Sequence, residues 1–96
     1  MAILNFNYNR AINQARQIET IASDMKNTAD KDMQTAIDSI GACWQGEASR
    51  QFIGYCSGVQ ADIIKQANDL KNIAVSLRSA AKIIKEAEDK AKKLQP

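Results

Sequence analysis

The chain lacks histidine, and its single proline is the last of its 96 residues. Without histidine, the usual general base of an active site and the commonest zinc ligand are both missing. Because the proline is Pro96, no helix elsewhere in the chain is interrupted by proline. Aromatic residues make up only 5% of the chain, and alanine, isoleucine, lysine and glutamine are abundant. This composition favours an all-α protein.

Other signals are missing as well. No apolar run approaches the roughly 20 residues that cross a bilayer, and the start of the chain, Met1–Asn5, has neither a basic region nor a long apolar stretch of a Sec signal peptide. A glycine-rich phosphate loop and a carboxylate pair that a small bundle would bury are also lacking. We therefore expect no enzyme, no metal site and no cofactor, and any export must use a route other than Sec.

The charges point away from nucleic acid as a partner. The net charge is +2, and acidic residues are interspersed among basic ones, as on solvated helix faces. Residues 82–94 are lysine-rich and amphipathic, which is one property of a membrane-surface helix. Glu86, Glu88 and Asp89 dilute this positive charge, which argues against a membrane surface.

The first long helix is predicted over residues 7–40. Asn7, with Asn5 as the alternative, is a suitable N-cap, and Gly41 follows the expected end. The buried stripe is expected to have a small central row and a second row that slips by one position at Asp32. The central row is Tyr8, Ala15, Ala22, Ala29 and Ala36, and the second is Ala11, Ile18, Met25 and then Met33.

The second helix is predicted over residues 47–93, with Glu47 suited to its positively polarised start. Two seven-residue rows predict a seam against another helix. One row is Cys56, Ile63, Leu70, Leu77, Ile84 and Ala91, and the other is Phe52, Val59, Gln66, Ile73, Ala80, Ala87 and Leu94. Because this helix is longer than the first, its end from about Lys82 is expected to overhang.

Residues 41–46 are predicted to form the turn between the two helices. This stretch holds the only tryptophan and two of the four glycines, and glycine permits turn conformations that other residues resist. Cys43 is expected to be a small buried residue. Residues 1–96 therefore form a single domain, an antiparallel helix-turn-helix hairpin.

Two antiparallel helices cannot enclose a core, so apolar surface must remain on the open side. We expect the hairpin to dimerise into a four-helix bundle, with a symmetric homodimer as the default. Gly54 and Gly58 lie four residues apart and off both apolar rows. A close helix crossing at a dimer contact is one reason for glycine there, and simple tolerance of glycine near a helix start is the other.

The turn carries a recognisable pattern, Trp44-Gln45-Gly46, which Ala48 and Phe52 extend to Trp-x-Gly-x-Ala-x-x-x-Phe. Midway along a chain of about a hundred residues and between two amphipathic helices, it resembles the WXG-hundred family, the small early-secreted-antigen-like proteins of type VII secretion. The resemblance implies a hairpin that forms homodimers or heterodimers. It also implies a cytoplasmic protein that is exported from Gram-positive bacteria by a membrane machine driven by a secretion ATPase.

Members of this family often carry a C-terminal Tyr-x-x-x-Asp/Glu export motif. Its positions fall on Ile84 and Glu88, so the acid is present and the aromatic residue is replaced. Two functions stay open: a small protein secreted as a folded dimer, and a cytosolic adaptor that heterodimerises with a larger effector and targets it for export. Trp44 either packs over the hairpin end, or its edge helps to recognise a neighbouring chain's tail.

Overall fold

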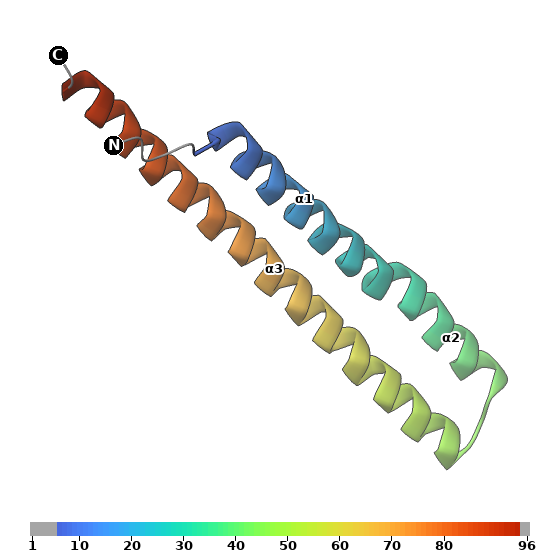
Figure 1. Ribbon diagram of the computed structural model, residues 1–96. Helices are drawn as coiled ribbons and strands as arrows, with labels where there is room; N and C mark the ends of the chain where they lie inside the picture. The colour runs from blue at the N-terminus through green and yellow to red at the C-terminus, as the bar shows by residue number, and fades with distance from the viewer. Residues whose placement is uncertain (1–5, 95–96) are drawn as a thin grey trace.

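The computed structural model describes residues 6–94, which form two antiparallel helical arms (Figure 1). The first arm consists of α1 (Tyr8–Asn27), the π-helical segment η1 (Thr28–Met33) and α2 (Gln34–Cys43) in one continuous run. The second arm is the single helix α3 (Glu47–Leu94). The part of the chain that the structure describes contains no strand. The all-α prediction and the helical hairpin are therefore confirmed.

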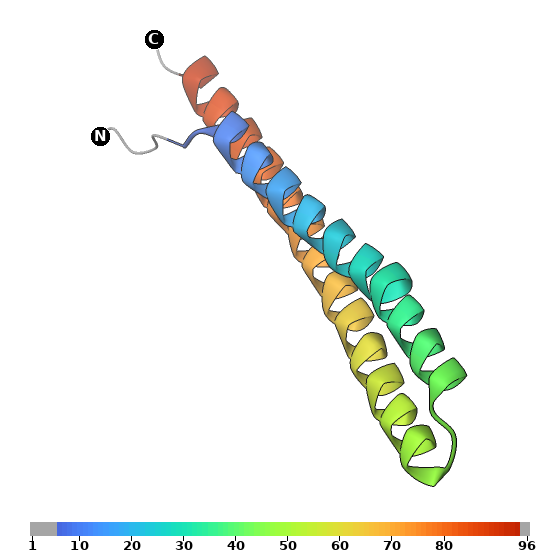
Figure 2. The ribbon, with the colours of Figure 1, turned by 90° about the vertical axis from the view of Figure 1, so that its right-hand side faces the viewer.

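The hairpin is a thin rod. Its principal extents are 78 × 15 × 15 Å, and the two arms lie side by side in both perpendicular views (Figures 1 and 2). The Cα radius of gyration is 21.7 Å, whereas a compact domain of this length would have about 12 Å. A rod of two helices has no enclosed centre, so both of its long flat faces are open to other molecules.

The arms meet along a seam of alanines. Ala15 and Ala29 from the first arm and Ala74 from α3 are completely buried. The other buried apolar residues are Ala11, Ala22, Ile37, Ala67 and Ala81. Methyl side chains let two helix axes approach closely, because interaxial distance follows the size of the side chains at the contact. In consequence, no large side chain among the described residues is fully buried.

The π-helical segment Thr28–Met33 explains the one-position slip in the sequence pattern. A π turn holds one more residue than an α turn, so the buried position after Ala29 moves from the expected Ala36 to Ile37, eight residues on. Ile37 is 7% exposed, while Ala36 faces solvent. The expected central row is thus correct up to Ala29 and wrong at Ala36.

A glutamine from the opposite arm binds this segment. The Gln60 side-chain amide donates to the carbonyl oxygen of Ala29 at 2.6 Å and to Gln34 Oε1 at 3.0 Å. Carbonyl groups in a widened turn find partners outside the regular helical ladder more readily, and inserted side chains of this kind mark helix irregularities. Gln60 therefore connects α3 to the π turn at a fixed height along the rod.

The two apolar rows predicted for α3 flank the seam on one side instead of forming it. Cys56, Ile63, Leu70, Leu77 and Ile84 are half-buried, while in the second row Phe52, Ile73 and Leu94 are exposed. The prediction that both rows make the seam is wrong. Large aliphatic residues mark the apolar side of a helix, but the line of closest approach takes the smallest residues, here the row of Ala67, Ala74 and Ala81.

The connection between the arms is shorter than the expected 41–46. The helix continues through Cys43, and only residues 44–46 lie outside helices. A Cβ at Gly41 would lie 3.7 Å from Ile53 Cδ1, so this helical glycine lies at a close contact between the arms. Gly46 is the turn residue, since its φ of 112° is one that other residues rarely adopt.

The open end of the rod is more covered than predicted. Asn7, the expected cap, accepts a hydrogen bond from the backbone N–H of Arg10 at 3.0 Å. The Lys85 ammonium lies 5.9 Å from the centre of the Tyr8 ring, and Ala81 is buried. The expected overhang therefore begins later than Lys82, because the first turn of α1 lies against α3 as far as Lys85, and the end of α3 still extends beyond the start of α1 (Figure 1).

Candidate functional site

The turn motif gathers at the closed end of the rod. The Trp44 and Phe52 rings lie 5.9 Å apart at 46°, and the Trp44 carbonyl oxygen accepts from the hydroxyl of the buried Ser49 at 3.2 Å. Gly46 turns the chain, and Ala48 lies in the first turn of α3. Trp44 nevertheless keeps 56% of its surface exposed. The geometry thus closes the turn and presents an aromatic surface to solvent.

Two further residues near this end are exposed: Cys43, which was expected to be buried, and Tyr55, whose exposure the sequence did not indicate. Cys43 is the last residue of α2 and is exposed, so the expectation that it is buried is wrong. Tyr55 is one of the most exposed large side chains. Because Tyr55 is a single aromatic residue outside the expected apolar rows, the sequence pattern did not predict whether its side chain is buried or exposed.

The candidate export residues lie one helical turn apart at the open end. Ile84 and Glu88 are both half-buried. Glu88 lines a shallow groove of about 520 Å³ together with Lys85, Lys92 and the start of the first arm, residues 6–9. Lys85 forms an ion pair with Asp89 at 3.1 Å, so charges of both signs gather near the positively polarised end of α1. The structure brings Glu88 next to residues 6–9, which the sequence did not indicate.

One flat face of the hairpin is apolar. A groove of about 410 Å³ lies between the arms and is lined by Ile21 and Met25 of α1 and Ile63 of α3, with Asp24 and Thr28 at its edge. Residues spaced by seven share a helix side, so the half-buried row through Ile63 continues this face in both directions. We name this surface the apolar face: Ile18, Ile21, Met25, Cys56, Val59, Ile63, Leu70, Ile73, Leu77 and Ile84.

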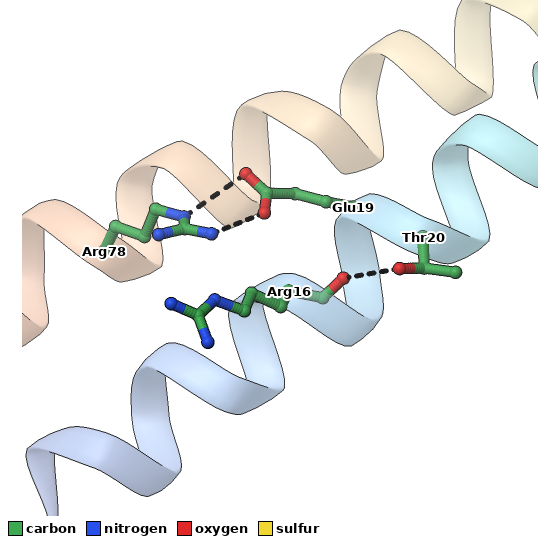
Figure 3. Close-up of polar contacts among 4 residues, drawn as sticks. All are labelled: Arg16, Glu19, Thr20 and Arg78. Atoms are coloured by element: carbon green, nitrogen blue, oxygen red, sulfur yellow. Dashed lines mark hydrogen bonds and ion pairs between the residues drawn. The ribbon is translucent and has the colours of Figure 1, made fainter.

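The other flat face, which we name the polar face, carries Glu19, Lys26, Lys71 and Arg78, with Ile64 seven residues before Lys71 on the same side of α3. Arg78 of α3 donates from Nε and Nη2 to the two carboxylate oxygens of Glu19 on α1, at 3.2 and 2.5 Å (Figure 3). The Arg78 hydrogen bonds hold the pKa of Glu19 below its usual value, and the charges of Arg78, Arg16 and Lys71 add to the effect. Glu19 in turn raises the pKa of Arg78. This two-bonded ion pair is the only salt bridge that joins the arms within residues 6–94.

Gly54 and Gly58 do not belong to the apolar face. A Cβ at either position would meet no atom within 4 Å. At about 100° per residue, Gly54 lies roughly opposite Ile63 around α3, and Gly58 lies about 140° away from it. The structure therefore does not bring the two glycines together with the main apolar surface.

The described residues offer little else for chemistry. Within residues 6–94, no three His, Cys, Asp or Glu side chains gather as a metal site would require. None of the helices in that range combines the length and apolar character that crossing a bilayer needs. The surfaces that distinguish this rod are thus its turn, its open end and its two contrasting faces.

Comparison with protein families gives one match that spans most of the chain. The family model described as "Proteins of 100 residues with WXG" (WXG100) matches residues 4–89. Comparison with curated proteins gives no match, and comparison with solved structures gives none either.

Proposed function

We propose that this chain, which belongs to the WXG100 family, is exported by type VII secretion as a folded dimer and acts by binding other proteins. Its family consists of small helical proteins associated with type VII secretion that lack signal peptides. The observation that carries the proposal is the apolar face, on a rod whose turn has the Trp44-x-Gly46 pattern.

The apolar face supports dimerisation on energetic grounds. The seam buries mostly methyl groups, each worth about 0.8 kcal/mol, whereas fixing one residue's backbone costs about 1–2 kcal/mol. Two hairpins that pack these faces together would bury the half-exposed isoleucines and leucines and complete a four-helix bundle. A second copy of the chain offers a matching surface by symmetry. Gly54 and Gly58 are not part of the contact that we propose.

Two neighbouring residues of α3 give a matched test of this interface. Ile73 is on the apolar face and Val75 is about 200° away around the helix, yet their exposed fractions are 54% and 52%. Ile73→Ser should weaken the dimer by about 2 kcal/mol, roughly thirtyfold, because each symmetric dimer loses two isoleucine side chains that the contact would bury. Val75→Ser should leave the dimer intact.

The measurement is molar mass by light scattering over a range of protein concentrations, with circular dichroism to check helicity. A monomer at all concentrations, or equal effects of the two substitutions, would exclude a homodimer through the apolar face.

Export is tested separately by detecting the protein in culture medium, with a cytosolic protein as the control for lysis. In a strain that lacks the secretion ATPase, this protein should be absent from the medium, and unchanged release would refute the proposed export route.

The alternative is a cytosolic adaptor that pairs with a larger type VII effector and targets it for export. It is favoured by Ile84, which replaces the tyrosine of the export motif, so that a partner would have to supply the complete signal. In that case the protein stays inside cells and co-purifies with a larger helical protein, and Ile84→Tyr causes its appearance in the medium. A stable homodimer that is itself exported contradicts the adaptor function.

A further inference from the structure

We propose that the polar face binds carboxylate groups of an acidic segment in a partner protein, through a cleft between Lys26 of α1 and Lys71 of α3. This binding site lies across the rod from the apolar face. It is independent of dimerisation, and a hairpin that used both faces would hold two different partners at once.

The cleft is a consequence of the alanine seam. Its volume is about 280 Å³, and its floor is formed by Ala22 and Ala67, whose methyl groups leave room above them. Lys26 and Lys71 come from opposite arms, and Ser23 and Asn68 provide neutral hydrogen-bonding groups beside them. A carboxylate in this space would meet two ammonium donors, a hydroxyl and an amide.

The ammonium groups that line the cleft outnumber its carboxylates, since Lys26 and Lys71 are present with one acid. The only carboxylate that lines the cleft, Glu19, accepts hydrogen bonds from Nε and Nη2 of Arg78. Figure 3 shows Arg16 one turn earlier on α1 with its guanidinium unpaired among the residues drawn. Within residues 6–94, neither Lys26 nor Lys71 forms an ion pair. An incoming acid therefore does not compete with an existing partner of the two lysines.

The arrangement of charge favours a protein segment over other anions. Lys71, Arg78, Lys85 and Lys92 recur every seven residues along α3 and extend over roughly 30 Å, a spacing that acidic residues on every second turn of a partner helix can match. A membrane-surface helix instead needs lysines that flank its apolar side chains. Here the aliphatic rows of α3 lie mainly on the opposite face of the rod.

The test is an NMR titration of the ¹⁵N-labelled protein with a hexaglutamate peptide, and with hexaglutamine as the uncharged control. Saturable shifts at Ser23 and at the Asn68 side-chain amide are expected only with hexaglutamate. Lys26→Gln/Lys71→Gln should weaken binding about fivefold, given the modest strength of exposed ion pairs. The control Lys65→Gln/Lys90→Gln removes the same charge from the outer side of α3 and should change the affinity less than about twofold.

Several results would overturn this assignment. Equal weakening by both double variants, or shifts spread over the whole surface, would show non-specific attraction. Saturation by inorganic phosphate at the same concentration would show a general anion site. Lysine-dependent sedimentation with mixed phosphatidylcholine and phosphatidylglycerol vesicles would show a membrane surface instead. Lys26→Arg/Lys71→Arg, which keeps the charges, should retain binding, and its failure to do so would contradict recognition by charge.

Discussion

Deleting one residue from the π turn tests the register of the hairpin. The buried positions Ala29 and Ile37 are eight residues apart, and in a regular α-helix this interval would turn them about 80° out of alignment. Removing the exposed Asp32 shortens the interval to seven residues. A seven-residue interval in an α-helix leaves the two positions only about 20° out of alignment. We therefore expect the deletion to convert η1 into α-helix and to leave both ends of the arm on the seam.

Deletion of Asp24 is the matched control, because it removes the same exposed residue type from the regular part of α1. It rotates everything before it by about 100° and places Gln14 and Ile21 where Ala15 and Ala22 lie. Overpacking costs about 1–3 kcal/mol per site, so two sites amount to about 2–6 kcal/mol, and the upper part of this range is enough to unfold a small hairpin. Deleting Asp32 costs about 1–2 kcal/mol, for the two hydrogen bonds of Gln60 that it displaces.

The assay is urea unfolding followed by circular dichroism, at one fixed protein concentration because association shifts apparent stability. The Asp32 deletion should keep its helicity and a midpoint close to that of the parent, whereas the Asp24 deletion should lose most of its helicity. Equal damage by the two deletions would refute the register argument. A stable Asp24 deletion would show that the alanine seam does not fix the contact between the arms.

Three further predictions concern the turn, the helix start and the ion pair. Gly46→Ala should destabilise the hairpin by about 1–3 kcal/mol, because alanine is strained at positive φ; an unchanged urea midpoint would contradict this. Asn7→Ala should cost about 1 kcal/mol and Asn7→Ser almost nothing, as measured by thermal unfolding. The hydrogen bonds from Arg78 lower the pKa of Glu19. The stabilisation by this ion pair is therefore complete above the ordinary glutamate pKa of about 4.3, and it is lost as the pH falls through the lowered pKa of Glu19. The urea midpoints of the parent and Glu19→Gln should therefore differ at neutral pH and converge as the pH falls below the lowered pKa of Glu19, and a constant difference would exclude this ion pair.

Much of the architecture could be predicted because helix signals are local. Asn7 begins α1 by bonding an amide three residues on, and Glu47 begins α3 as expected. The central row of the first arm also predicted close helix packing, because from Ala15 onward it contains only alanine. The hairpin followed from Trp44-x-Gly46 between two long amphipathic stretches.

The errors all concern contacts between the arms. Gly41 was interpreted as the end of a helix, but it lies inside α2 near Ile53, a contact between residues twelve apart that no local rule contains. The sequence shows the one-position slip at Asp32, but a π turn and a frayed helix would both give this pattern. The hydrogen bond from Gln60 to the Ala29 carbonyl, which only the structure shows, distinguishes the two. The cleft between Lys26 and Lys71 also joins residues 45 positions apart, so only the fold could reveal it.

The alanine seam has a consequence for where the protein is folded. A rod whose arms share mostly methyl groups gains much of its stability from whatever covers its apolar face, so folding and association become one equilibrium. In a dimer, the folded fraction then falls as the total concentration falls. Release from a crowded cell into a large outside volume would by itself loosen the rod and uncover its aliphatic surface. If the chain is exported as the proposed dimer, dilution would thus limit how long the folded rod persists without a new partner.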